Sequence, residues 1–94
     1  MLYRIITENI MVNESEICKM TSNYFPSFTL YDAWGYCKGV REYCLIIEIS
    51  TNSPITFDGE TRDDAIKELC SNIRELNDQD CVLLQQIECK ETFI

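Results

Sequence analysis

The stretch FTLYDAWGYCKGVREYCLIIEIS, residues 28–50, predicts two strands joined by a turn. Residues 28–39 are expected to form a long strand that ends in a turn at Gly39. Residues 42–51 are rich in β-branched side chains, which favour strands. Their alternation places one set of side chains on a single face: Tyr43, Leu45, Ile47 and Ile49. Two such strands so close in sequence predict a β-hairpin.

The segment before this hairpin predicts a strand and a helix. Residues 2–8, LYRIITE, alternate as a strand does. Residues 12–25 are expected to be helical, because Asn13 and Glu16 have the spacing of a capping box. One helical face would carry Ile17, Met20, Thr21 and Tyr24. Pro26 should end this helix, since proline disfavours helical geometry in the residue before it.

The segment after the hairpin predicts a loop, a second helix and a last strand. Residues 52–60 contain loop-forming Pro54 and Gly59. Residues 61–77 are expected to be a helix, with Thr61 as its N-cap. The apolar stripe of this helix would be Ile66, Leu69, Cys70, Ile73 and Leu76. Residues 80–89 predict a fourth strand, which the tail at 90–94 could extend.

The resulting order, βαββαβ, predicts a single ferredoxin-like domain over residues 1–94. This α+β fold is a four-stranded antiparallel sheet with two helices on one face. The opposite face would carry Cys44, Ile46 and one set of aromatic side chains without a cover. Because exposed apolar faces mark interaction sites, we expect a homo-oligomer.

Composition and charge limit the classes of function. The net charge is −8, with 8 basic and 16 acidic residues, so binding to a nucleic-acid polymer is not expected. No apolar run approaches the length of a membrane span, and residues 1–10 lack the basic region of a signal peptide. These features predict a cytoplasmic protein that does not bind membranes.

Catalytic and metal-binding signatures are missing from the sequence. It has no histidine, which removes the commonest general base and all Cys/His zinc sites. The six cysteines include no CxxC pair, and we expect reduced, mostly structural thiols. The acidic run at 56–64 lacks the spacing of a calcium loop and is typical of a solvated helix start. We therefore expect neither an enzyme nor a cofactor.

A cluster of aromatic and basic residues in the hairpin is the candidate binding site. Aromatic rings can stack on a planar ligand, and basic side chains can bind a phosphate or carboxylate. The candidate ligand-binding residues are Tyr31, Trp34, Tyr36, Lys38, Arg41 and Tyr43. The same residue types are enriched at subunit interfaces, so the cluster suits a ligand site, an interface, or both at a subunit junction.

Alternation divides the first strand of the hairpin into two sets. One face would carry Phe28, Leu30, Asp32, Trp34, Tyr36 and Lys38, and the other Thr29, Tyr31, Ala33, Gly35 and Cys37. The pattern leaves open which set faces inward, because a shift of one residue exchanges the two faces.

The chain also resembles a group of small uncharacterised α/β proteins of bacteriophages and bacteria. The shared pattern is Phe-Pro, Phe-Thr-Leu-x-Asp-Ala, Gly-aromatic, a Gly-containing turn, Arg-Glu and a late Gln-acidic-x-Val-Leu. In this sequence it falls on Phe25, Pro26, Phe28, Thr29, Leu30, Asp32, Ala33, Gly35, Tyr36, Gly39, Arg41, Glu42, Gln79, Asp80, Val82 and Leu83. Cys37 and Cys44 depart from the residues usual at their positions.

This resemblance implies a ferredoxin-like fold, similar to signalling regulators of the nitrogen-regulatory class, and no settled enzyme activity. Phage proteins that look like this include anti-defence sponges, which trap a nucleotide immune signal in the host cytoplasm. We therefore expect a sequestering protein for a cyclic nucleotide or an ADP-ribose derivative. The alternative is an interaction protein that inhibits a host protein and binds no small ligand.

Overall fold

The computed structural model describes residues 1–51, 61–92 and 94. Its elements in chain order are β1 (Leu2–Glu8), a short 3-10 turn η1 (Met11–Asn13), α1 (Glu14–Tyr24), β2 (Thr29–Cys37), β3 (Val40–Ser50), α2 (Arg62–Asn77) and β4 (Leu83–Ile87). The loop expected at 52–60 lies outside the described residues.

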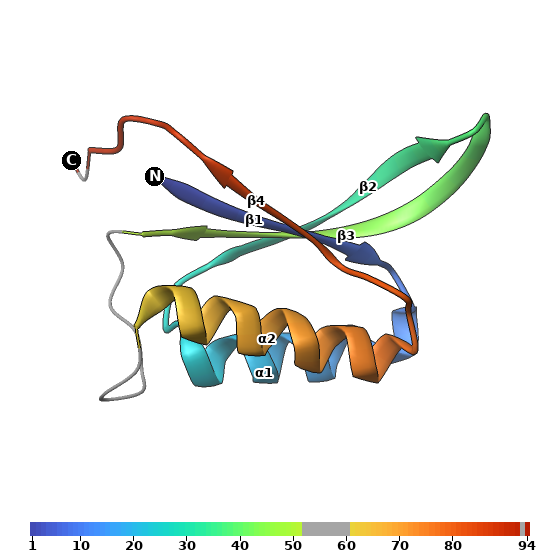
Figure 1. The fold of residues 1–94 in the computed structure, drawn as a ribbon, viewed down its shortest axis with the longest axis horizontal. Coiled ribbons are helices and arrows are strands. Elements are labelled where there is room, and N and C mark those ends of the chain that lie inside the picture. The colour runs from blue at the N-terminus through green and yellow to red at the C-terminus, as the bar shows by residue number, and fades with distance from the viewer. Residues whose placement is uncertain (52–60, 93) are drawn as a thin grey trace.

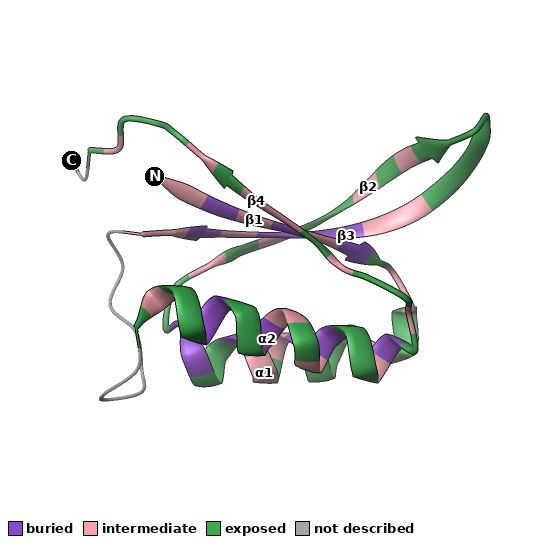
Figure 2. Cartoon of the chain, viewed as in Figure 1, coloured by how far each residue is buried: buried purple, intermediate pink, exposed green. Residues whose placement is uncertain are grey.

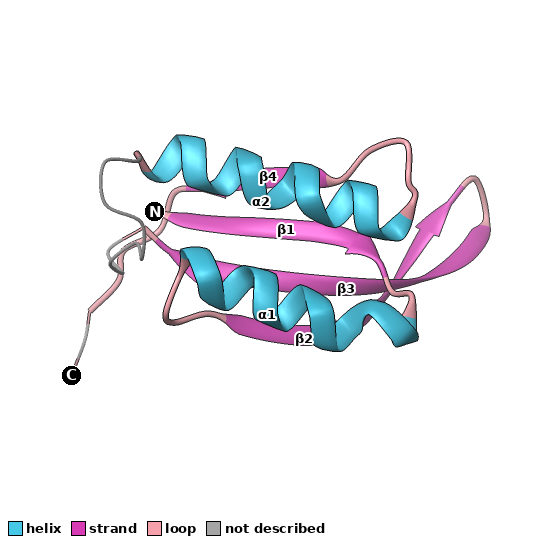
Figure 3. Ribbon diagram, turned by 90° about the horizontal axis from the view of Figure 1, so that it is seen from below, coloured by secondary structure: helices cyan, strands magenta, loops and turns pink. Residues whose placement is uncertain are grey.

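The described strands form one antiparallel sheet in the order β2-β3-β1-β4. Both helices lie against the same face of this sheet, as Figures 1 and 3 show. No helix of the described chain covers the opposite face (Figure 1). The predicted α+β ferredoxin-like βαββαβ fold is therefore confirmed.

The core lies between the sheet and the helices. Buried residues alternate with more exposed ones along β1 and recur along both helices, as the colours of Figure 2 show. The predicted apolar face of β3 is confirmed, because Leu45, Ile47 and Ile49 are fully buried. The two predicted apolar helix faces pack against these strand residues. Their buried members are Ile17, Thr21 and Tyr24 of α1 and Ile66, Leu69 and Ile73 of α2, with Met20, Cys70 and Leu76 packed beside them.

The N-cap prediction is confirmed for one helix and wrong for the other. Thr61 caps α2 as predicted, since its hydroxyl accepts a hydrogen bond from the Asp64 backbone N–H at 3.1 Å. The capping box expected at Asn13 and Glu16 is wrong, because the Asn13 side chain makes no cap hydrogen bond. Its amide instead donates to Leu76 O and Asn77 Oδ1, at 3.3 and 3.0 Å. A residue that looks like a local cap therefore joins the two helices.

The last strand is shorter than predicted. It runs from Leu83 to Ile87, and residues 80–82 lead into it outside the sheet. The described part of the tail, residues 90–92 and 94, does not extend it. Within the described sheet, β4 is an edge strand that pairs with β1.

The hairpin of β2 and β3 extends beyond the rest of the sheet (Figure 1). β1 ends opposite Cys44, while β3 begins four residues earlier, at Val40. The predicted turn is confirmed as the two residues Lys38 and Gly39, with φ of 52° and 79°. Positive φ at both positions matches the strand twist of a two-residue hairpin. The aromatic end of the hairpin is thereby held clear of the helices.

Candidate functional site

The six side chains proposed as a ligand site lie in three places. Trp34 is opposite Tyr43 and Tyr36 is opposite Arg41, so these four share the hairpin face that continues the core side of the sheet. Tyr31 is opposite Ile46 and therefore lies on the uncovered side. Lys38 lies in the turn. The structure thus brings four of the six residues together on one face.

A stack of three side chains orders the exposed part of this face. The guanidinium of Arg41 lies 4.2 Å from the centre of the Trp34 ring, which is a cation–π contact. The rings of Trp34 and Tyr43 are 4.8 Å apart and tilted by 38°. Trp34 is still 56% exposed. Arg41 is therefore held in a defined orientation, and much of the indole stays open to solvent.

Asp32 connects this stack to the end of β1. Its carboxylate accepts a hydrogen bond from the Asn9 side-chain amide at 2.9 Å. A hydrogen bond from the Tyr43 hydroxyl to the same carboxylate raises the Tyr43 pKa, with desolvation adding to the shift. The backbone N–H of Asn9 also donates to Tyr43 O at 2.9 Å. Tyr43 is therefore held at both its backbone and its hydroxyl.

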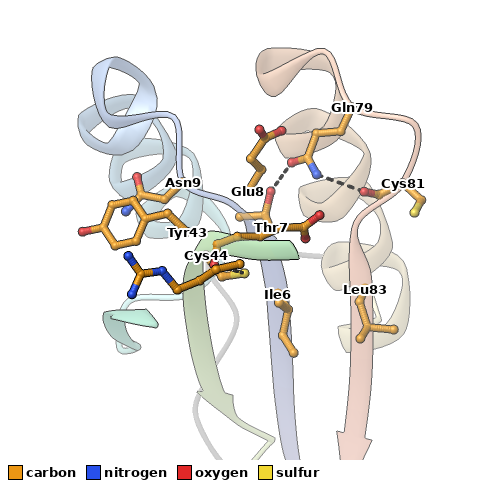
Figure 4. Close-up of a pocket in the computed structure, with 11 residues that line it drawn as sticks. Ile6, Thr7, Glu8, Asn9, Tyr43, Cys44, Gln79, Cys81 and Leu83 are labelled. Atoms are coloured by element: carbon orange, nitrogen blue, oxygen red, sulfur yellow. Dashed lines mark hydrogen bonds between the residues drawn. The ribbon is translucent and has the colours of Figure 1, made fainter. Parts of the chain in front are cut away.

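A cleft of about 570 Å³ opens beside Tyr43, where β1 ends and the hairpin continues (Figure 4). The lining comes from the end of β1, the first half of β3, the α2–β4 loop and the start of β4. Its residues are Ile6, Thr7, Glu8, Asn9, Arg41, Glu42, Tyr43, Cys44, Gln79, Cys81 and Leu83. Of the predicted site residues, Arg41 and Tyr43 line this cleft.

A buried hydrogen-bond network supports the cleft on the α2 side. The Asn77 amide, only 4% exposed, donates to Thr7 Oγ1, Glu8 O and Gln79 Oε1, at 3.1, 3.0 and 3.0 Å. The Thr7 hydroxyl also donates to Gln79 Oε1. The Gln79 amide donates to Cys81 O at 3.1 Å, as Figure 4 shows. The network therefore fixes Gln79 in the wall of the cleft.

The polar groups of the cleft can contact both the charged and the hydroxyl groups of a small ligand. It contains the Arg41 guanidinium, the Gln79 amide and the exposed carboxylates of Glu8 and Glu42. The guanidinium can bind a phosphate in a bidentate manner, and carboxylates accept hydrogen bonds from hydroxyl groups. Within the described residues, no group of three or more His, Cys, Asp or Glu could hold a metal ion.

Sequence reasoning missed Thr7, Glu8 and Gln79, which come from segments far from the hairpin in sequence. Gln79 did carry a signal, because it belongs to the late Gln-acidic-x-Val-Leu pattern of the resemblance. Thr7 and Glu8 carried none, since they read as the end of an ordinary strand. Only the sheet order β3-β1-β4 places β1 between the hairpin and the last strand.

Tyr31 takes part in a separate polar cluster on the uncovered side of the sheet. Arg4 donates to Glu48 Oε2 at 3.0 Å from Nη2 and 3.3 Å from Nε. A hydrogen bond from the Tyr31 hydroxyl, followed by that from Arg4, lowers the Glu48 pKa against the opposing effect of desolvation. Ile46, predicted on this side, is only 6% exposed. The uncovered face therefore has a polar group near its middle.

This cluster predicts a pH-dependent contribution to stability. The folded pKa of Glu48 is lowered, so its contribution is present above the ordinary pKa of 4.5 and is lost as the pH falls through the folded value. Glu48→Gln should lower the melting temperature at pH 7, and the difference should shrink by pH 3. Tyr31→Phe removes the largest cause and should reproduce part of the effect. An equal difference at both pH values would contradict this role.

Comparisons with known proteins give no match to a family model, a curated protein or a solved structure. The helices of the described chain are all too short or too polar to cross a membrane.

All six cysteines are unpaired in the structure, and burial raises the pKa of Cys70 to about 11.

Proposed function

We propose that the chain is a non-enzymatic binding protein that holds a nucleotide-type ligand in the cleft beside the hairpin, and that it acts as a homo-oligomer. The observation that carries this proposal is the position of Arg41. Its guanidinium lies on the Trp34 ring, and Arg41 lines the cleft together with Tyr43. A cation oriented before binding loses little side-chain freedom when it binds a phosphate.

The other lining groups suit the sugar of such a ligand. Glu8 and Glu42 offer carboxylate oxygens, which bind ribose hydroxyls in many nucleotide sites. Because these two acids outnumber the single cation of the lining, we favour a ligand with ribose hydroxyls and few phosphates. A cleft of about 570 Å³ also has the size of a small-molecule site.

The biological role that fits these features is sequestration. With no catalytic group singled out, the protein would act by stoichiometric binding and slow release. The sequence resemblance to phage anti-defence sponges suggests that the ligand is a nucleotide immune signal, a cyclic nucleotide or an ADP-ribose derivative. In that setting the protein would work in the cytoplasm of the infected host.

Thermal-shift screening against cyclic mononucleotides, cyclic dinucleotides and ADP-ribose tests this proposal. A ligand at 100 times its Kd should add about 2.7 kcal/mol of apparent stability. Arg41→Ala should abolish that gain, and Arg41→Lys should restore only part of it because the bidentate geometry is lost. Lys67→Ala, an exposed cation on α2 outside the cleft lining, is the charge-matched control and should keep the full shift.

Two results would overturn the proposal. Full ligand affinity in Arg41→Ala would remove the cleft as the site. Recovery of a chemically altered ligand after heat denaturation would show an enzyme, whereas sequestration returns the ligand intact.

Inhibition of a host protein is the second candidate function. It is favoured by the exposed apolar side chains of the hairpin, with Trp34 56%, Tyr36 70% and Val40 63% exposed. Tryptophan, tyrosine and arginine are the residues that most often dominate binding energy at interfaces. An inhibitor of this kind would hold the receptor of a signal and leave the signal itself free in solution.

A further inference from the structure

The outer edge of β2 offers a long row of free backbone hydrogen-bonding groups. β2 is the last strand on its side of the described sheet and contains 9 residues. Its pairing with β3 is continuous from Thr29 to Cys37, so no bulge interrupts the edge. The opposite edge strand, β4, has only 5 residues. β2 is therefore the better template for pairing with another strand.

The residues whose backbone points outward can be identified. Asn9 N–H donates to Tyr43 O, so odd-numbered residues of β3 point their backbone groups at β1 and even-numbered ones at β2. The register then pairs odd-numbered residues of β2 with β3 through hydrogen bonds. Four residues of β2 are left with outward N–H and C=O groups: Leu30, Asp32, Trp34 and Tyr36.

This edge lacks the features that prevent association. Residues 29–37 contain no lysine, arginine or proline, the residues that commonly protect edge strands. Asp32 is their single charged residue, and its carboxylate is already hydrogen-bonded to Asn9. Three aromatic side chains of the strand are exposed: Tyr31, Trp34 and Tyr36. An edge this long, unbroken and aromatic is suited to an occupant.

We propose that the occupant is a second copy of this chain, paired antiparallel to β2 about a two-fold axis at Ala33. The two four-stranded sheets would then form one continuous sheet. Ala33 is the middle residue of Thr29–Cys37, so this register alone pairs the strand over its whole length. The proposal names the surface through which the proposed homo-oligomer forms, and it rests on the proposed function only for its relevance to ligand binding.

The register about Ala33 also matches the side chains. It places Tyr36 opposite Leu30 of the partner subunit, which extends the half-buried packing of Leu30, and Tyr31 opposite the partner's Gly35. Trp34 lies opposite the partner's Asp32. The Asp32 carboxylates of the two copies are therefore not opposite each other. An axis at Asp32 would instead put two carboxylates directly opposite each other, which is destabilising. An axis at Trp34 would leave Thr29 and Leu30 opposite no strand residue.

The proposed dimer leaves the cleft accessible. The cleft lies along the β1-facing side of β3, whereas the dimer edge is the far side of β2. Each copy would therefore keep its own cleft, and pairing would hold the hairpin that carries Arg41 and Trp34 in one place. Dimerisation and ligand binding can consequently be measured separately.

Disulfide crosslinking tests the register. The pairing places Thr29 opposite Cys37 of the partner subunit in a non-hydrogen-bonded pair, with Cα atoms about 4.5 Å apart, within disulfide range. Within one chain the two positions are about 26 Å apart along the strand. Thr29→Cys should therefore give a covalent dimer under mild oxidation, with the new thiol joined to Cys37 by peptide mass mapping. Tyr31→Cys, two residues out of register, is the matched control and should not crosslink to Cys37.

Sedimentation gives an independent readout without any ligand. The 11.0 kDa chain should sediment at twice its mass, and Ala33→Lys should return it to one copy because two like charges then meet at the axis. Gln86→Lys, exposed on the other edge strand, should remain dimeric. A monomeric wild-type chain, or a dimer that gives no crosslink from position 29 to Cys37, would overturn the proposal. Neither outcome bears on ligand binding by the cleft.

Discussion

Ile47→Ala is expected to lower the free energy of unfolding by about 2–5 kcal/mol. Ile47 is fully buried on β3 and lies between Ile5 of β1 and Leu30 of β2 in the sheet. Removing its outer carbons leaves a cavity under both neighbours, which the surrounding strands can only partly close. Urea denaturation followed by circular dichroism measures the loss.

Val40→Ala on the same strand is the control for this variant. Val40 is 63% exposed at the hairpin end, so its truncation should change stability by no more than about 0.5 kcal/mol. A domain of this size has only about 5–15 kcal/mol of net stability, so the core variant removes a large share. Equal losses in the two variants would show that the buried face of β3 has been misplaced.

Asn77→Ala is expected to cost about 2–4 kcal/mol, although it removes only a small polar side chain. Its amide group donates to Thr7, Glu8 and Gln79 and accepts from Asn13. Without it, buried donors and acceptors lose their partners but cannot reach water, and each such loss carries a desolvation penalty. The network also joins the start of α1, the end of β1 and the end of α2, so the effect spreads over three elements.

Asn72→Ala is the control for Asn77→Ala. Asn72 also lies on α2, but its side chain makes one described hydrogen bond, to the Tyr24 hydroxyl at 3.1 Å. Its truncation should cost about 1 kcal/mol. Asn77→Ala should in addition weaken ligand binding, because Gln79 loses its support while Asn77 itself does not line the cleft. Unchanged stability in Asn77→Ala would contradict the role of the network.

Most of the secondary structure could be predicted because its causes are local. The alternation of Leu45, Ile47 and Ile49 and the stripe on α2 each express the period of a single element. Gly39 and Thr61 act within a few residues of their own position. Element order then led to the ferredoxin-like fold.

The candidate site was only partly predictable. Trp34, Tyr36, Arg41 and Tyr43 were found together because they are neighbours across one hairpin. Tyr31 was grouped with them by composition, although strand alternation puts it on the other side of the sheet. Gln79, Thr7 and Glu8 join Arg41 only through pairings between distant strands, which a local pattern does not contain.

The sequence by itself determined the elements, the buried faces of β3 and the helices, and the aromatic hairpin. The tertiary structure alone decided which side of the hairpin faces the helices and how far it extends beyond β1. It also decided that Asn13 joins the helices instead of capping one. The physical reason is that side-chain period and turn chemistry act over a few residues, whereas the cleft depends on strands brought side by side by the packing of the whole core.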